Sequence, residues 1–220
     1  MKVLNLYAGL GGNRQLWDGV EVTAVEMDER VAQIYQQQFP QDTVIVGDAH
    51  QYLLDNYDAG WNFIWASPPC QSHSRMMKAT RHDVRKYPDM KLYQEIILLQ
   101  HFFDGKWVVE NVVPYYSPLL PATKVGRHLF WSNFTIRASD IPTPPGFIDM
   151  PSAEGTKVLK DWLGIQYDGN LYLGGNHCPN QALRNCVHPI LGEQVFNSSF
   201  FDDQHDMFGM PEINSGRTYE

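Results

Sequence analysis

The sequence predicts an α/β protein with a doubly wound, mostly parallel sheet, helices on both faces and a short irregular C-terminal lobe. Three observations support this fold class. Short apolar runs alternate with helix-like stretches through the first half, a glycine-rich turn follows the first apolar run, and prolines interrupt the pattern after residue 138. Alternation of strands and helices is typical of a parallel sheet that helices cover.

Six segments predict strands, in chain order residues 2–8, 22–26, 43–46, 63–66, 107–109 and 129–136. Helices are predicted to open at residues 13–17 and to span residues 29–39, before Pro40, and 87–103. In the last of these, Leu92, Ile96, Leu99 and Phe103 recur at helical spacing, which indicates one buried face. Beyond the prolines, helices are predicted at residues 157–163 and from 183 or 189 to 196.

These elements predict three parts. Residues 1–136 form the core, 137–182 a short irregular lobe, and 183–220 a segment that returns to the core and ends in an acidic tail. The 220 residues, 43% of them hydrophobic, can bury a full core. No apolar run is long enough to span a bilayer, the N-terminus lacks the layout of a signal peptide, and three cysteines fit a reducing compartment. We therefore expect a soluble cytoplasmic protein.

The net charge of −8 argues against coating of nucleic acid by the whole surface, because such affinity rests on neutralised phosphates. Cations nevertheless gather between residues 75 and 91, namely Arg75, Lys78, Arg81, Arg85, Lys86 and Lys91. This segment is either a solvated face or a loop that meets phosphates. Its position directly after Cys70 favours the second interpretation.

Three consecutive strand ends predict a nucleoside site. Gly9, Gly11 and Gly12 form a turn after the first strand, Glu26 ends the second, and Asp48 follows the third. Ligands of doubly wound sheets bind at these carboxyl ends. Glu26 could accept hydrogen bonds from both ribose hydroxyls and Asp48 one from an adenine amino group. The Gly-x-Gly-x-x-Gly spacing of nicotinamide sites is absent.

The fourth and fifth strand ends carry reactive groups. Pro68-Pro69-Cys70-Gln71 follows one and Glu110-Asn111-Val112 the other. The prolines fix the backbone, so Cys70 is well placed as a nucleophile, and a nearby acid could neutralise the ring nitrogen of a pyrimidine under attack. A cation such as Arg75 or Arg127 would have to favour the thiolate. The alternatives are a structural buried cysteine and a carboxylate at a helix N-terminus.

These motifs resemble, in order, the signature motifs of the DNA cytosine-C5 methyltransferases, and the resemblance extends from Val3 to about Phe196. Residues 7–12 are similar to the first motif, with Tyr7 in place of the usual Phe; residues 26–28 and 47–48 correspond to the second and third. The nucleophile loop usually reads Pro-Cys-Gln-x-Phe-Ser, and His73 replaces its Phe. The resemblance implies a Rossmann-like methyltransferase sheet and methyl transfer from S-adenosylmethionine to cytosine in DNA through a covalent Cys70–C6 adduct.

The resemblance also implies roles for particular residues. The catalytic residues would be Cys70, Glu110, Arg127 and Gln71. The cofactor would be bound by Tyr7, Gly9, Leu10, Gly11, Glu26, Met27, Asp48, Pro69 and Asn185. The substrate would be bound by Ser72, Ser74, Arg75 and Asn111. No metal is expected, because the spacing of His177, Cys178, Cys186 and His188 matches no zinc module.

The sequence departs from the family pattern in three places. Only Arg127 of the Arg-x-Arg motif is present as arginine, with His128 beside it, and Arg184 replaces the glycine of the last motif, which Asn185 and Val187 match. Residues 135–183 are also too few for a full target-recognition domain. We therefore expect duplex or single-stranded DNA as substrate, base flipping, a possible partner protein that recognises sequence, and a prokaryotic, phage or restriction-modification origin. The same chemistry on free dCMP or RNA, or a non-catalytic binding module, stays open as an alternative.

Overall fold

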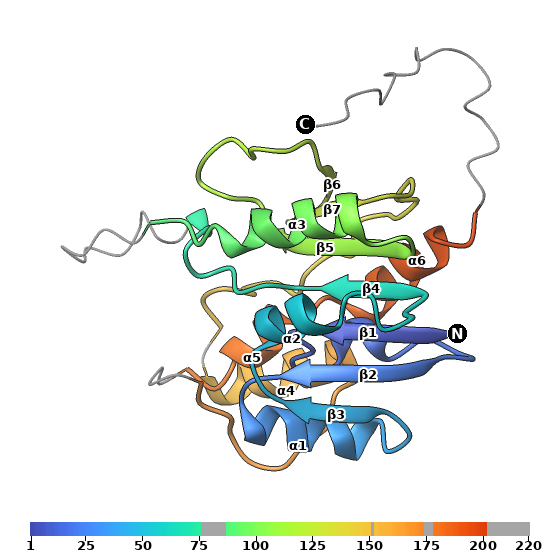
Figure 1. Cartoon of the computed structure of the whole chain (residues 1–220). Helices are drawn as coiled ribbons and strands as arrows, with labels where there is room; N and C mark the ends of the chain where they lie inside the picture. Colours follow the sequence, from blue (N-terminus) through green and yellow to red (C-terminus); the bar gives the residue numbers. More distant parts are fainter. Residues whose placement is uncertain (76–86, 151, 174–177, 202–220) are drawn as a thin grey trace, which may run out of the picture.

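The computed structural model describes residues 1–75, 87–150, 152–173 and 178–201 (Figure 1). Within these residues, seven strands form one sheet in the order β3-β2-β1-β4-β5-β7-β6. The strands are β1 (Lys2–Leu6), β2 (Glu21–Glu26), β3 (Thr43–Val46), β4 (Phe63–Ala66), β5 (Lys106–Val112), β6 (Thr123–Val125) and β7 (His128–Ser132). The α/β class and the mostly parallel sheet are confirmed.

The first five strands pair in parallel, and the last two reverse the direction. β7 runs antiparallel to β5, with Glu110 opposite Phe130, and β6 runs antiparallel to β7. Parallel neighbours need long crossovers, which the helices between β2, β3, β4 and β5 provide. The connection of β6 to β7 is a short turn at Gly126, which permits an antiparallel pair.

Helices cover both faces of the sheet (Figure 1). They are α1 (Glu29–Gln38), α2 (Ala49–Asn56), α3 (Lys91–Phe102), α4 (Ser152–Leu163), α5 (Gln181–Asn185) and α6 (Pro189–Ser198), with a single 3-10 turn, η1 (Gly12–Arg14). On one face, Leu53 of α2 and Ile96 of α3 pack on β1, β4 and β5. On the other, Tyr35 of α1 and Val195 of α6 pack on the same sheet.

The helix predicted to open at residues 13–17 is reduced to the η1 turn, and the C-terminal helix α6 covers the sheet in its place. A Cβ on Gly192 would lie 2.6 Å from the Asn13 Cα, so the backbones of α6 and η1 are in direct contact. The rings of Trp17 and Phe196 stack at 4.8 Å. The segment that follows the lobe is therefore part of the core of the sheet.

Two elements, α2 and β6, were not predicted, and several boundaries differ: β1 ends at Leu6, α3 begins at Lys91 and α4 begins at Ser152. Helix α2 begins at Ala49 and is capped by Asp48, whose side chain accepts from the His50 amide, and β6 is a three-residue strand too short to show alternation. The strand predicted at residues 129–136 is β7, which ends at Ser132. β5 continues to Val112, so Glu110 lies inside a strand and not after it.

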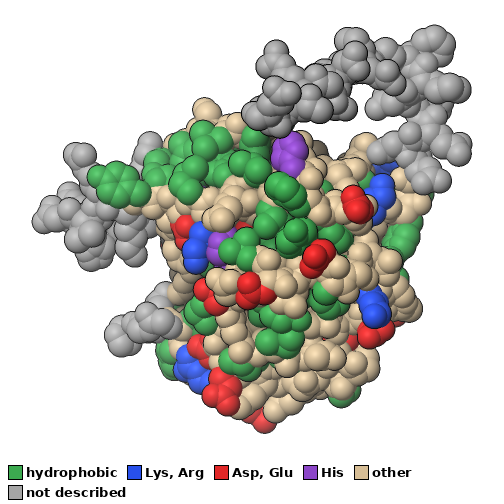
Figure 2. Space-filling view, in the orientation of Figure 1, with side chains coloured by type: hydrophobic (Ala, Val, Ile, Leu, Met, Phe, Trp, Pro, Cys, Tyr) green, Lys and Arg blue, Asp and Glu red, His purple; other side chains and the backbone are tan. Residues whose placement is uncertain are grey.

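The lobe contains the helix α4 and packs on the glycine turn. Leu159 and Leu163 of α4 contact a cluster that includes Leu10 after β1, Val31 of α1 and Leu183 of α5. On the face seen in Figure 2, hydrophobic side chains gather over α3, where Ile97 and Phe102 are exposed. In the described part of the chain, no helix is both long and apolar enough to cross a membrane.

Candidate active site

Glu26 joins the glycine turn to the end of β2. The Gly9 amide donates to Glu26 Oε2 and the Asp28 amide to Glu26 Oε1, both at 2.9 Å. Gly9 and Gly11 have φ values of +55° and +77°, which favour glycine because a Cβ would be strained there. The turn is therefore held open at the carboxyl end of β1, with a carboxylate beside it.

The hydrogen-bond acceptors and the apolar side chain at the ends of these strands suit a nucleoside. Each Glu26 oxygen accepts one amide and keeps capacity for a second donor, such as a ribose hydroxyl. Met27 is 65% exposed and offers an apolar surface next to it. Asp48 is exposed as well and caps α2 through the amides of His50 and Gln51, at 2.9 and 3.3 Å. The residues present thus fit the cofactor that the resemblance implies.

Tyr7, the variant residue of the first motif, is connected to α3 by a buried network. Its hydroxyl donates to Glu95 Oε1, and His50 Nδ1 shares a 2.8 Å hydrogen bond with the same oxygen. Glu95 is fully buried, and burial together with the Glu95 charge raises the pKa of the Tyr7 hydroxyl. Tyr7 alone among the described non-glycine residues has a positive φ, of 57°. This network fixes the residue that opens the glycine turn.

Cys70 lies in a tight turn tied to β5. The amides of His73 and Ser74 donate to the Cys70 carbonyl at 3.0 and 2.9 Å. Asn111 Nδ2 donates to the Pro68 carbonyl at 2.9 Å, and its side chain is buried. Asn111 therefore holds the loop of Cys70 in place from within the strand that carries Glu110.

Glu110 meets His128 across the β5–β7 pair. His128 Nδ1 and Glu110 Oε1 share a 2.6 Å hydrogen bond, and both side chains are almost fully buried. Burial and the charge of Glu110 raise the pKa of the Cys70 thiol, and the Arg127 charge opposes this. In the structure Cys70 is therefore a thiol at neutral pH, close enough to the Glu110 carboxyl group to be affected by its charge.

Arg127 lies between Cys70 and the C-terminal segment. Its guanidinium donates to the carbonyls of Arg184 and Cys186 at 3.1 and 3.0 Å and lies over the Phe147 ring. Burial lowers the pKa of this guanidinium, and the Glu110 charge opposes that effect. Of the two cations predicted to favour the thiolate, Arg127 acts on Cys70, whereas Arg75 Nε donates to the Pro114 carbonyl.

The C-terminal motif lies against the glycine turn. A Cβ on Gly12 would lie 2.4 Å from the Val187 carbonyl oxygen and 2.9 Å from Cys186 Cβ. Burial raises the pKa of the Cys186 thiol to about 12. Asn185 ends α5 and is exposed, one residue before this contact.

The remaining predicted residues occupy the nucleophile loop and the turn. Gln71 and Pro69 are exposed, Leu10 is buried, Ser72 Oγ accepts from the Asp89 amide at 3.0 Å, and Ser74 forms a bridge with Pro114. The structure thus brings two sets together, Cys70 with Glu110 and Arg127, and Gly9 with Glu26. Lys78, Arg81, Arg85, Lys86 and His177 lie outside the described residues. Among the described residues, no group of three His, Cys, Asp or Glu side chains could hold a metal ion.

Two residues of the site were not assigned a role from the sequence, His128 and His73. His128 stood out only as the neighbour of Arg127, yet its ring is the partner of Glu110. His73, in place of the usual Phe, is buried and shares a 2.5 Å hydrogen bond with the Tyr116 hydroxyl. Burial lowers the pKa of His73, so this ring is neutral at physiological pH. In the sequence, both residues could have been noticed only because they stand where the chain departs from the family pattern.

A sheet of this order, with a nucleoside-type edge at β1–β3 and a thiol and carboxylate at β4 and β5, defines the Rossmann-like methyltransferase class. The model of the C-5 cytosine-specific DNA methylase family matches residues 1–114, and the chain belongs to this family. A search of curated proteins found no match.

Solved structures of methyltransferases resemble the chain at low identity. Dnmt2 methyltransferase of S. pombe is 20% identical with a TM-score of 0.39, over 51% of this chain and 34% of that one. DNMT2 of Spodoptera frugiperda, as a triple mutant, is 26% identical with a TM-score of 0.35, over 50% and 35%. A methyltransferase of Entamoeba histolytica is 18% identical with a TM-score of 0.34, over 51% and 38%. The match therefore covers little more than a third of each of these three methyltransferases.

Proposed function

We propose that the chain methylates C5 of cytosine in DNA, with S-adenosylmethionine as methyl donor and a covalent bond between Cys70 and C6 of the base. The observation that carries this proposal is the placement of the Cys70 thiol, after β4, near the charge of Glu110 in the neighbouring strand β5, where Glu110 is paired with His128. Membership of the cytosine methylase family supports the reaction class.

The reaction end would work as follows. Cys70 passes its thiol proton to the Glu110 carboxylate and its Sγ adds to C6, while Glu110 gives a proton to N3, so the negative charge of the adduct is neutralised as it forms. The addition makes C5 an enamine-like nucleophile, which takes the sulfonium methyl that the cofactor supplies. A base then removes the C5 proton, the Cys70–C6 bond breaks with its electron pair returning to the sulfur, and N3 gives its proton back to Glu110.

His128 would serve Glu110. Because its imidazole is hydrogen-bonded to the Glu110 carboxyl group, it can return a proton after N3 has taken one. This is a part that a histidine can perform and a permanently charged arginine cannot.

The cofactor end would bind through the strand edge. Glu26 would accept from the ribose hydroxyls, Met27 would pack on the adenine, and Asp48 would accept from its amino group. Pro69 and Asn185 would border the pocket from the nucleophile loop and from α5. Since Asp48 already accepts two amides, an adenine amino group would be a further partner on an exposed carboxylate.

Incubation with methyl-labelled S-adenosylmethionine tests the proposal. Duplex DNA, single-stranded DNA, RNA and dCMP are offered in separate reactions, with wild-type protein and Cys70→Ser. We expect label in DNA and none with Cys70→Ser. Label in RNA or dCMP alone would overturn DNA as the substrate, label in none of the four would overturn the activity, and full activity of Cys70→Ser would overturn the nucleophile.

A further inference from the structure

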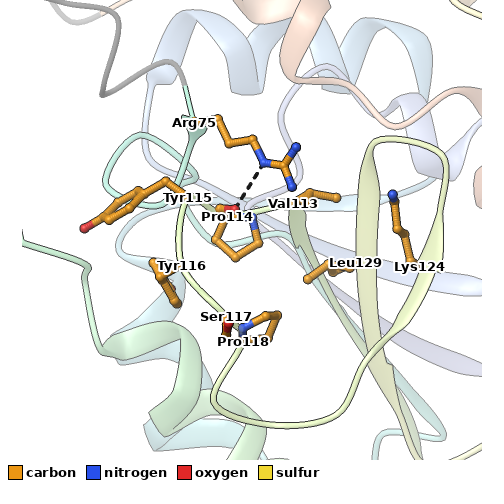
Figure 3. Close-up of a pocket in the computed structure, with 9 residues that line it drawn as sticks. All are labelled: Arg75, Val113, Pro114, Tyr115, Tyr116, Ser117, Pro118, Lys124 and Leu129. Carbon is orange, nitrogen blue, oxygen red and sulfur yellow. Dashed lines mark hydrogen bonds between the residues drawn. The ribbon is translucent and has the colours of Figure 1, made fainter.

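An open groove lies beside the nucleophile loop, over the last strands of the sheet (Figure 3). Its volume is about 790 Å³, within the range of ligand sites. The groove exists because residues 113–122 join β5 to β6 without a helix, so the face above Leu129 is left open. Nothing in the proposed chemistry at Cys70 uses it.

The groove and the nucleophile loop form one structural unit. Ser74 forms a β-bridge with Pro114, and the Tyr115 amide donates to the His73 carbonyl at 3.1 Å. Val113, at the groove floor, directly follows the strand that carries Glu110. A ligand in the groove would therefore lie next to the substrate of Cys70.

The charges that border the groove are positive. Arg75 extends over Pro114, where its Nε–H donates to the carbonyl at 3.3 Å, and Lys124 lies to the right in Figure 3. Among the described residues, the Arg75 guanidinium forms this one hydrogen bond, through Nε. Its two terminal NH2 groups can therefore donate to a ligand. None of the described lining residues carries a carboxylate, so the groove suits phosphate groups.

An aromatic ring is fixed on the other side. Tyr116 is held through its hydroxyl by neutral His73 at 2.5 Å, and the Tyr115 ring packs edge-on against it at 5.2 Å. The alternative is a purely structural role, in which Tyr116 only packs on the hydrophobic cluster under α3. It nevertheless lines the groove and is only partly buried.

We propose that this groove binds unpaired nucleotides of the strand that carries the target cytosine, with one base stacked on Tyr116 and phosphates at Arg75 and Lys124. Cations that follow a backbone and a ring that stacks a base are the features of single-strand sites. A base in a duplex is already stacked on its neighbours and cannot meet the ring. That this strand is also the methylated substrate rests on the proposed function. Binding of a single strand in the groove does not depend on that function.

Fluorescence anisotropy with labelled thymidine and uridine dodecamers tests the groove. Neither probe contains cytosine, so binding is measured apart from methyl transfer. Arg75→Gln combined with Lys124→Gln should lower the magnitude of the salt slope, log Kd against log salt concentration, by about 1.4 for two lost phosphate contacts. Tyr116→Leu should weaken binding about tenfold or more, and Tyr116→Phe, which keeps the ring, by less than about threefold.

Lys106→Gln is the matched control, because Lys106 is exposed at the start of β5, whereas the groove lies beyond the other end of that strand. An equal salt slope for the double variant and this control would overturn the proposal, as would tighter binding of a duplex through the same two cations, or no binding of either dodecamer at low salt. If methyl transfer failed on every substrate while dodecamer binding followed Arg75 and Lys124, the proposed function would fail and the groove would stand. Tighter binding of one dodecamer identifies the strand as DNA or RNA.

Discussion

At the scale of single residues, the state of Cys70 decides how the site starts its reaction. Burial and the nearby Glu110 charge both raise the pKa of the thiol, so it binds its proton above the pH at which an ordinary cysteine releases it. At pH values below that pKa, each increase of one pH unit raises the fraction of thiolate about tenfold. Protonation of Glu110, which the proposed reaction needs before N3 receives a proton, would remove part of this effect.

Alkylation of Cys70 by iodoacetamide should therefore be slow at neutral pH and rise steeply with pH. Glu110→Gln removes the negative charge, so alkylation at pH about 8 should become several-fold faster. Peptide mapping by mass spectrometry measures the rate, with Cys178 as an internal control. A slower rate in Glu110→Gln would show that the carboxylate does not raise the pKa of the thiol.

His128 should matter to turnover more than to cofactor binding. His128→Gln can still donate a hydrogen bond to Glu110 but cannot exchange a proton, so kcat should fall roughly 100-fold, the lower end for general acid–base catalysis. The pH profile of kcat should also lose one limb. Binding of S-adenosylhomocysteine by calorimetry is the control, and equal kcat with an unchanged profile would assign His128 a structural role only.

At the scale of elements, the contact of α6 with η1 replaces a helix between β1 and β2. Gly192 permits this contact, because a Cβ there would come within 2.6 Å of the Asn13 backbone. The same pair of elements supports the glycine turn from below. The stability of the sheet and the geometry of the cofactor edge therefore depend on one close approach.

Gly192→Ala should lower the free energy of unfolding by about 1–3 kcal/mol, as overpacking does, despite the better helix propensity of alanine. Urea unfolding measures this. Gly47→Ala is the control, since an added Cβ there has no heavy atom within 4 Å and the backbone needs no positive φ. If both variants were equally stable, α6 would not pack as tightly as described.

At the scale of the whole molecule, the parallel part of the fold could be predicted because each strand–helix unit carries its own periodicity. The β6–β7 pair could not, since the three residues of β6 show no pattern. Nor could the role of α6, because its partner Asn13 lies far from it in the sequence.

The candidate site shows the same division. Cys70, Glu26 and Asp48 could be found from their positions at strand ends, because such ends share one edge of a parallel sheet. The Glu110–His128 pair depends on the antiparallel register of β5 and β7, which places residues 110 and 128 on one side of two neighbouring strands. Likewise, the Tyr7–Glu95 contact joins a turn to a helix far along the chain.

The central claim is that Cys70 forms a covalent bond with a cytosine. An oligonucleotide with 5-fluorocytosine tests it most directly, because the fluorine on C5 cannot leave as a cation and the adduct cannot resolve. With S-adenosylmethionine present, intact mass spectrometry should show protein plus oligonucleotide plus one methyl group, and peptide mapping should place the adduct on Cys70. An adduct on Cys178 or Cys186, or methylation of cytosine without any adduct on the fluorinated strand, would contradict the account.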